Sequence, residues 1–207
     1  MSFDQSAFAD LGLGEALSTI EERLQFPLVV KPARQGSALG IRVAHEPGEV
    51  PQALVSAFSY DTRVLLERHV PGRELAVSLV DGPGGPVALP VVEAVLGDTE
   101  IYDFAARYSI GETRFECPAR LPDVVPERAA EVSLAVYRLL GCRGFARADF
   151  MFDEAGAGLQ LLEVNAIPGL TDTSLLPIAA DAAGIDFDDL VERLVSGAVS
   201  VSRVSAR

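Results

Sequence analysis

The sequence predicts an α+β fold, and two observations indicate it. Short apolar runs of strand length are separated by turns rich in Gly and Pro, and other segments carry apolar residues at helical spacing. The order of these segments is not the strict alternation of strands and helices found in a doubly wound parallel sheet. The 207 residues give room for one large domain or two small ones.

The chain begins with an expected helix and an expected strand pair. One side of the helix predicted over residues 15–24 is apolar, through Ala16, Leu17, Ile20 and Leu24. The proline-bounded run 26–32 and the run 41–44 predict two strands. Because a Gly-bearing turn separates these strands, they are expected to form a hairpin.

The middle of the chain predicts a helix, three strands and a loop. Residues 48–59 have a helical pattern, and 63–69 form a strand that ends at a Pro-Gly turn. Strands are expected at 75–80 and 87–94, on either side of the turn DGPGGP. Residues 97–121 show no clear period, so they predict a long loop, a kind of segment that is often functional.

The last third contains the strongest helix signal. The helix predicted at 126–140 has a proline in its first turn, an apolar stripe and a terminal Gly141. Strands follow at 145–152 and 159–164, joined by a Gly-rich turn. From Leu175 onward the pattern is helical, with a stripe formed by Phe187, Leu190, Val191, Leu194 and Val195.

Composition narrows the class of protein. The chain is 49% hydrophobic with a formal net charge of −13, which suits a folded domain and argues against a nucleic-acid partner. No apolar run could span a bilayer, and the N-terminus does not resemble a signal peptide, so no membrane partner is expected. Cys117 and Cys142 lie in no metal-binding pattern and are expected to be reduced. A cytoplasmic location follows.

The most informative stretch is a pair of strands that carries carboxylates. Side chains two residues apart share a face of a strand, so Arg147 lies with Asp149, and Glu163 with Asn165. If Asp149 pairs with Glu163 in an antiparallel hairpin, all four polar groups lie on one side. The other side is then a core face, formed by Ala146, Ala148, Phe150, Leu162 and Val164.

Two carboxylates and an amide oxygen on one face favour a hard cation such as Mg²⁺, with Arg147 beside it for a phosphate or oxyanion. The alternative is a solvated sheet face with an ordinary Arg–carboxylate network, and a register slip of one residue would scatter the four groups.

A Pro-Gly turn follows the carboxylate strands. Its backbone N–H groups, together with Ser174 and the start of the next helix, could hold an anion such as a carboxylate. The alternative is a plain loop in which a Ser or Thr side chain caps the helix.

Four segments in order resemble the D-alanine–D-alanine ligases of the ATP-grasp superfamily. They are FPLVVKPARQGSALGI at 26–41, LERHVPGREL at 66–75, IYDFAARY at 101–108 and LLEVNAIPGLTDTSLLP at 161–177. In that family these segments are the phosphate-covering hairpin, the adenine hinge with the ribose contact, the mobile loop and the closing motif. The resemblance covers nearly the whole chain from Phe26 on.

The resemblance implies a fold and a set of site residues. The fold would be ATP-grasp, two α+β subdomains that hold ATP between their sheets, with residues 1–74 as the small subdomain and 75–207 as the large catalytic one. The implied nucleotide contacts are Lys31, Gly36, Glu67 at the hinge, Glu74 at the ribose, and Arg107. The implied ligands of two Mg²⁺ ions, which Mn²⁺ could replace, are Asp149, Glu163 and Asn165. Arg147 and the backbone of Gly169 would stabilise the tetrahedral intermediate, Tyr108 and Ser37 would form a hydrogen-bonded set, and Ser174 with the N–H of Leu175 would hold the second D-alanine.

The resemblance also implies the activity. An ATP-dependent carboxylate–amine ligase would join two D-alanine molecules through an acyl phosphate, for peptidoglycan precursor synthesis and thus cell-wall biogenesis and cell shape. Alternatives are a ligase with another acceptor such as D-lactate, a nucleotide-binding module that is inactive without a partner domain, and an α+β domain that binds no ligand.

Two departures from the family pattern stand out. Arg107 replaces the family's lysine, which keeps the charge but changes its geometry. Only 25 residues precede Phe26, too few for the family's N-terminal substrate domain. The chain is therefore expected to be a truncated ligase whose activity alone is in doubt. It is also expected to have an exposed apolar patch, from which a homodimer could follow.

Overall fold

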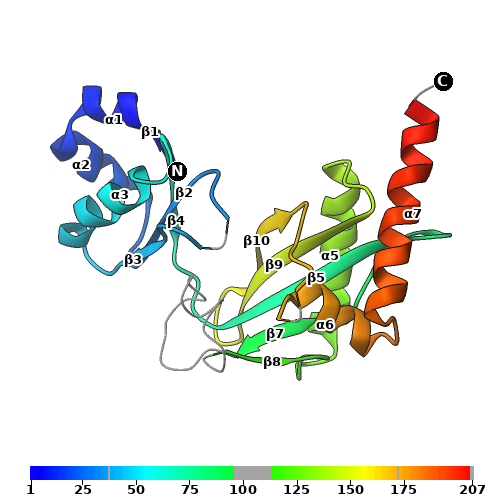
Figure 1. Ribbon diagram of the computed structural model, residues 1–207. Coiled ribbons are helices and arrows are strands. Elements are labelled where there is room, and N and C mark those ends of the chain that lie inside the picture. Colours follow the sequence, from blue (N-terminus) through cyan, green and yellow to red (C-terminus); the bar gives the residue numbers. More distant parts are fainter. Residues whose placement is uncertain (37, 96–112, 172, 206–207) are drawn as a thin grey trace. The chain divides into compact units, whose positions relative to one another are not determined.

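The computed structural model describes residues 1–36, 38–95, 113–171 and 173–205. The chain divides into two compact units, Met1–His69 and Val70–Val95 with the described residues from Arg114 onward. Each unit combines helices with an antiparallel sheet (Figure 1). The α+β class predicted from the sequence is therefore confirmed.

The first unit is a four-stranded sheet with the strand order β1-β4-β2-β3, packed against helices. Its elements are β1 (Ser2–Asp4), α1 (Gln5–Leu11), α2 (Leu13–Arg23), β2 (Leu28–Pro32), β3 (Arg42–Ala44), the 3-10 turn Pro47–Glu49, α3 (Val50–Phe58) and β4 (Arg63–Arg68). Strands β2 and β3 form the expected hairpin. Alternate residues of β2 and β4 are fully buried with Ile20 and Leu54, so the remaining residues of these strands point to the other face.

The second unit is built on a six-stranded sheet with the order β10-β9-β5-β7-β8, in which β6 also pairs with β5. Its elements are β5 (Arg73–Gly82), β6 (Gly85–Ala88), β7 (Val92–Val95), β8 (Arg114–Glu116), α5 (Val124–Leu139), β9 (Phe145–Asp153), β10 (Gly158–Asn165), α6 (Leu175–Ala182) and α7 (Phe187–Ser205). The two longest strands, β5 and β9, pair over eight residues and form the centre of the sheet.

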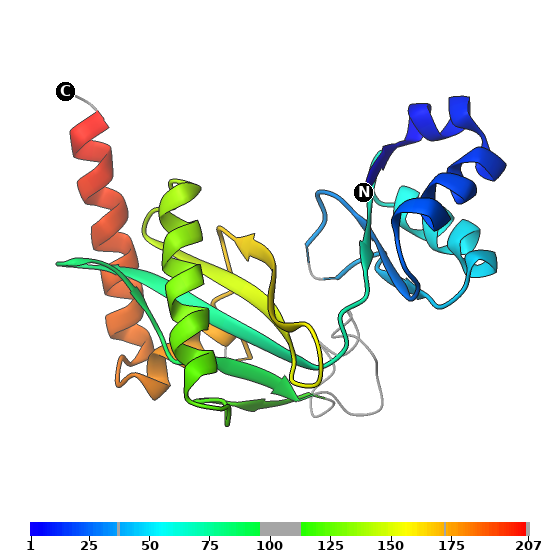
Figure 2. The same cartoon turned by 180° about the vertical axis from the view of Figure 1, so that it is seen from behind.

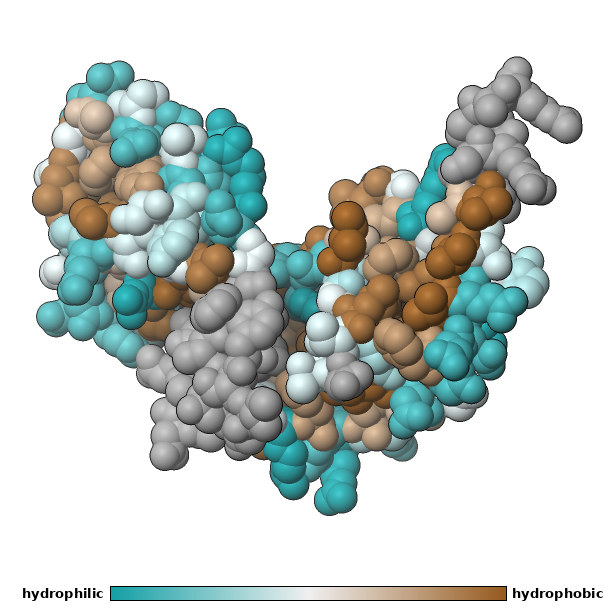
Figure 3. Space-filling view, in the orientation of Figure 1, coloured by the Kyte–Doolittle hydropathy of each residue, from teal (hydrophilic) through white to brown (hydrophobic). Residues whose placement is uncertain are grey.

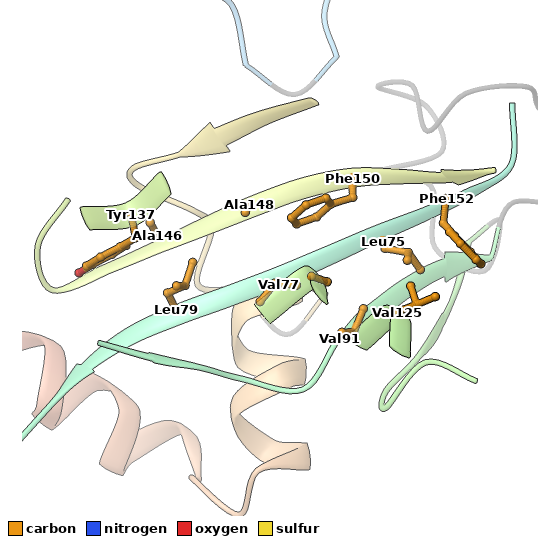
Figure 4. Packing of buried hydrophobic residues seen from close by; sticks show 11 residues of the cluster. Leu75, Val77, Leu79, Val91, Val125, Tyr137, Ala146, Ala148, Phe150 and Phe152 are labelled. Atoms are coloured by element: carbon orange, nitrogen blue, oxygen red, sulfur yellow. The ribbon is translucent and has the colours of Figure 1, made fainter. Parts of the chain in front are cut away.

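Helices cover both faces of this second sheet. The residues of β5 and β9 that pack against α5 form one core, shown in Figure 4; they are Leu75, Val77, Leu79, Ala146, Ala148, Phe150 and Phe152. On the other face, Ala76 and Val80 of β5 pack with residues of α6 and α7. Figures 1 and 2 show α5 on one side of the sheet and α6 with α7 on the other. The side chains of β5 thus alternate between two cores. The face of the sheet that α6 and α7 cover is also the face of the predicted polar residues.

Several expected elements differ from the structure. The strand expected at 87–94 is interrupted between β6 and β7, at the position of Pro90, which has no N–H to donate to a sheet. The expected loop at 97–121 contains β8, which adds to the edge strand β7. Strand β1 and helix α1 were not expected, because β1 is only three residues long and its pairing with β4 is a long-range contact.

Helix α7 carries apolar surface outside the core. Leu190 is fully buried, whereas Phe187, Val195 and Val199 are 48%, 57% and 48% exposed. Apolar residues, coloured brown, lie along the surface of this helix in the space-filling view (Figure 3). None of the helices in the described parts of the chain combines the length and the apolar character that a bilayer crossing requires.

Candidate functional site

Strands β9 and β10 bring together the polar residues predicted from the carboxylate hairpin. Glu163 pairs directly with Asp149, and Asn165 pairs with Arg147. Because directly opposite residues of an antiparallel pair share a face, all four side chains lie on one side of the sheet. The register predicted from the sequence is therefore confirmed.

A β-bulge at Leu162 produces this register. Near the turn, Gly158 pairs with Asp153 and Leu161 with Phe150, a register that would place Leu162 opposite Asp149. The register shifts by one residue after Leu161, so Glu163 takes that place instead. The prediction that Leu162 belongs to the core face is wrong: as the extra residue it is 39% exposed, while Ala146, Ala148 and Phe150 are buried as expected.

Asp149 is the centre of the polar group. Its carboxylate accepts hydrogen bonds from Arg147 Nε at 2.6 Å and Nη2 at 2.8 Å, and from Asn165 Nδ2 at 2.7 Å. The side chains of Arg147 and Asp149 are only 11% and 8% exposed, so this is a largely buried ion pair. Glu163 is exposed and accepts a longer bond of 3.3 Å from Asn165 Nδ2.

The charges around Arg147 outweigh its burial. Burial alone lowers the pKa of Arg147, but the hydrogen bonds to Asp149 and the negative charges of Asp149, Glu163 and Glu74 raise it overall. The guanidinium is therefore held as a permanent cation beside the carboxylates. A permanent cation at this place can pair with a phosphate or with developing negative charge.

The donor set fits a hard cation. Asp149, Glu163 and Asn165 offer carboxylate and amide oxygens, the ligands that Mg²⁺ prefers. Asn165 presents its amide nitrogen to both carboxylates, and a turn of the amide would present its oxygen to a cation instead. Within the described residues, no group of three His, Cys, Asp or Glu side chains is arranged as a metal site. The magnesium site therefore stays a prediction.

Glu74 lies on the same face of the sheet. It pairs with Met151 of β9, and Ala76, two residues further along β5, pairs with Asp149. Since residues at i and i+2 share a face, Glu74 joins the face of Asp149 from the neighbouring strand. One side of this sheet thus carries the predicted ribose contact together with the predicted metal ligands.

In the first unit, Lys31 of β2 and Glu67 of β4 form an ion pair. Lys31 Nζ lies 2.7 Å from Glu67 Oε2, and the side chains are 12% and 39% exposed. Both residues lie on the sheet face away from the core, because their neighbours Val30 and Leu66 are fully buried. Gly36 is exposed in the turn between β2 and β3. The pair places two predicted nucleotide contacts on one surface of this unit.

The turn that holds Gly36 is fixed at its base. Arg34 Nη2 lies 2.5 Å from Oδ1 of Asp61, and the Arg34 backbone N–H donates to Oδ2 at 2.8 Å. The hydrogen bond from Arg34 holds the pKa of the Asp61 carboxyl well below its usual range. The Arg34 side chain is thus engaged with Asp61.

The loop before α6 contains the predicted substrate contacts. Ser174 Oγ accepts a hydrogen bond from the Thr171 N–H at 3.1 Å and lies 2.8 Å from Thr171 Oγ1. Ser174 occupies the N-cap position of α6, but its side chain does not cap the helix. A Cβ on Gly169 would lie 2.7 Å from Ser174 Oγ, so a side chain there would have to displace this hydroxyl. The first turn of α6, which begins at Leu175, has no side-chain cap.

Three predicted residues, Ser37, Arg107 and Tyr108, lie outside the described residues.

One residue of the second unit was not singled out from the sequence. Ser78 of β5 pairs with Arg147 and is fully buried on the polar face. The period-2 alternation of β5 already groups it with Glu74 and Ala76, but only the pairing with β9 reveals its neighbour.

Comparisons with known proteins identify the family of the chain. The family model described as D-ala D-ala ligase C-terminus matches residues 5–196. A D-alanine–D-alanine ligase of Syntrophotalea carbinolica is 42% identical over 173 residues, which are 84% of this chain and 54% of that protein. The chain thus spans about half the length of the curated relatives it matches.

Solved structures of similar proteins show the same fold. A crystal structure of a D-alanine–D-alanine ligase from Bacillus anthracis is 31% identical, with a TM-score of 0.78 over 99% of this chain and 62% of that one. The ATP complex of a ligase from the same organism is 28% identical, with a TM-score of 0.70 over 98% and 59%. The predicted ATP-grasp fold is confirmed, and the chain belongs to the D-alanine–D-alanine ligase C-terminal family.

Proposed function

We infer that this chain is the ATP-grasp part of an ATP-dependent carboxylate–amine ligase that joins two D-alanine molecules. The observation that carries the inference is the pairing of Asp149 with Glu163 beside a buried Arg147, in a chain of this family. Because the chain matches about half of its relatives' length, the activity of the whole protein is part of the proposal. Its product would enter peptidoglycan precursor synthesis in the cytoplasm.

In this proposal ATP binds with its phosphates toward the carboxylate face. Asp149, Glu163 and Asn165 would hold Mg²⁺, which when bound neutralises charge on the phosphates. The face already carries two carboxylates that the Asn165 amide bridges, which supports this assignment. Lys31, Gly36 and Arg107 would contact the phosphates, Glu67 would mark the adenine hinge, and Glu74 would accept hydrogen bonds from the ribose.

The remaining residues would act on the two D-alanine molecules. The carboxylate of the first D-alanine attacks the γ-phosphate to give an acyl phosphate and ADP. The amine of the second then attacks the acyl carbon and expels phosphate, losing a proton. Arg147 and the Gly169 N–H would stabilise the oxyanion of that tetrahedral intermediate. Ser174 and the Leu175 N–H would hold the second carboxylate, which is supported by the uncapped start of α6.

Tyr108 and Ser37 would form a hydrogen-bonded set near the reacting groups. Residues 1–74 would be the small subdomain and 75–207 the large one. The division seen between His69 and Val70 falls just before β5, a strand that belongs wholly to the second unit. A homodimer is a further part of the proposal, supported by the exposed apolar residues of α7.

A second reading is a nucleotide-binding module that is inactive without another domain. Such a module would carry the same ATP site on its two units. A ligase that uses another acceptor, such as D-lactate, would share the same ATP site. Phosphate release from ATP in the presence of D-alanine separates an active ligase from the module, which would bind ATP without turnover.

Calorimetric titration of ATP with excess Mg²⁺ tests the site. Glu163→Gln removes one charge from an exposed carboxylate, so the variant should fold, and the affinity for ATP with Mg²⁺ should fall at least tenfold if Glu163 is a ligand. Glu131→Gln, an exposed carboxylate on α5, is the matched control and should bind as the wild type does. Equal affinities of the two variants, or no binding by the folded wild type, would contradict the proposed site.

A further inference from the structure

Ser78 has a buried hydroxyl with no partner. The residue is fully buried at the centre of β5. In the described parts of the chain, its Oγ is the only buried side-chain nitrogen or oxygen that lacks a hydrogen-bond partner. Buried hydroxyls are normally hydrogen-bonded, because losing water without gaining a partner is unfavourable. The hydroxyl therefore does not stabilise this state of the protein.

The sheet places this hydroxyl beside Arg147. Ser78 pairs with Arg147 on β9, and Arg147 pairs with Asn165 on β10, so the three residues form one row across the polar face. Cβ atoms of directly opposite residues lie about 5 Å apart, within reach of a guanidinium. On β5 itself, the neighbours of Ser78 on this face are Ala76 and Val80, which pack under α6 and α7. Ser78 thus contributes the polar atom of β5 in the row of Arg147.

Arg147 is committed to Asp149 in this structure. Its Nε and Nη2 groups both donate to that carboxylate. In the proposed function, the same carboxylate oxygens hold a divalent cation, which repels the guanidinium. Arg147 then needs another acceptor to stay on the reacting face. Asn165 and Glu163 are themselves among the proposed metal ligands, and Glu74 is the proposed ribose contact. The Ser78 hydroxyl is the acceptor that β5 offers directly opposite Arg147.

We propose that Ser78 is a positioning residue, whose Oγ accepts a hydrogen bond from the Arg147 guanidinium when Asp149 is engaged by magnesium and ATP. This proposal rests on the proposed function. The hydroxyl is unpaired in the free protein and becomes paired in the loaded one. It fixes the direction in which Arg147 points on the reacting face, where the oxyanion of the tetrahedral intermediate forms.

The proposal predicts that one substitution has opposite effects on the stability of the free protein and on its affinity for ATP. Ser78→Ala removes an unpaired buried hydroxyl, so the Tm of the free protein rises by roughly 2–5 °C. The same substitution removes a hydrogen bond from the loaded state, so the Kd for ATP with Mg²⁺ rises about tenfold. Calorimetric titration and thermal unfolding of the full chain measure both.

Ser133 supplies a matched control. It is a second buried serine of the same unit, but its Oγ already donates to the Ala129 carbonyl at 2.7 Å. Ser133→Ala should not raise the Tm and should leave the ATP affinity unchanged. In an Arg147→Met background, Ser78→Ala should no longer change the affinity, because the guanidinium that it pairs with is gone.

Three outcomes would overturn the proposal. A lower Tm for Ser78→Ala would mean that the hydroxyl is already partnered in the free protein. An unchanged Kd in Ser78→Ala, with ATP bound by the wild type, would remove the positioning role and leave the proposed function intact. A wild type that does not bind ATP with Mg²⁺ would overturn both proposals, since Arg147 would have no reason to leave Asp149.

Discussion

Glu163 lies opposite Asp149 because Leu162 is extruded from the strand as a bulge. If Leu162 instead stayed in the ladder opposite Asp149, Glu163 would pair with Ala148 and point into the core that packs against α5. A single-residue register shift thus separates a carboxylate site from a buried, unpaired charge. The bulge is consequently part of the site.

Breaking the buried ion pair should destabilise the second unit. Asp149→Ala leaves Arg147 charged in a place where it is only 11% exposed, which should reduce the free energy of unfolding by about 3 kcal/mol. Urea denaturation measures the loss. Glu131→Ala breaks the exposed pair with Arg128 and should cost less than about 1 kcal/mol. Equal losses would show that Arg147 finds water or another partner.

Replacing both charged residues should destabilise the protein less than replacing Asp149 alone. Arg147→Met with Asp149→Leu removes both members of the buried pair and leaves neither as an unpaired buried charge, so the double variant should be more stable than Asp149→Ala. It should also have lost the affinity for ATP with Mg²⁺. A double variant that unfolds as easily as the single one would mean that the pair contributes packing rather than charge compensation.

Gly169 and Ser174 should behave as a coupled pair. In Gly169→Ala the new Cβ meets Ser174 Oγ, which must turn away and lose its bonds to Thr171, at a cost of about 1 kcal/mol. Ser174→Ala loses the same bonds. In the double variant, the Cβ of residue 174 would lie 3.6 Å from the methyl group of residue 169, which is an ordinary contact. The double variant should therefore be no less stable than either single one. Additive losses in thermal unfolding would contradict this coupling.

Gly72 should tolerate no side chain. It has a φ of 125°, and a Cβ there would lie 2.2 Å from the Phe152 carbonyl oxygen. Gly72→Ala should reduce the free energy of unfolding by about 3 kcal/mol, because both the backbone and the sheet must shift. Gly141→Ala is the control, since Gly141 has a φ of 66° and nothing within 4 Å of a Cβ. It should cost about 1 kcal/mol, and a similar cost at Gly72 would mean that the start of β5 moves freely.

Cys117 should react slowly with alkylating reagents. Burial, with a smaller effect of the Asp181 charge, raises the pKa of its thiol to about 11 from the ordinary 9.0. At pH 8 the reactive thiolate is then about a hundredfold scarcer than for an unperturbed cysteine. Iodoacetamide labelling followed by peptide mass spectrometry should show slow modification of the folded chain and ordinary modification in urea. Equal rates would mean that the thiol is accessible.

The same shift makes a prediction for alkaline stability. Folding raises the pKa of this thiol, so the neutral thiol stabilises the folded protein when the pH is below about 9, the pKa of the unfolded chain. This contribution is lost as the pH rises from about 9 to 11. Cys117→Ala should show a weaker loss of Tm over that range than the wild type does. An identical loss would mean that other groups cause the alkaline transition.

The sequence by itself determined the local elements and the polar face. Helix α5, the hairpin of β2 and β3, and the grouping of Arg147 with Asp149 follow from short-range periodicity, which any one segment carries on its own. The pairing of Asp149 with Glu163 was also expected, because only one register keeps the polar groups together. Four ordered motifs then indicated the family that the comparisons confirm.

The tertiary structure decided what depends on distant segments. The bulge at Leu162, the pairing of Ser78 with Arg147 and the three-stranded face that includes Glu74 arise where β10, β9 and β5 meet. Strands β5 and β9 are more than sixty residues apart in sequence. The period-2 pattern of a strand determines which side chains share a face of that strand. Only packing of the whole sheet between α5 and the α6–α7 pair decides which strands are neighbours, and therefore which charges meet.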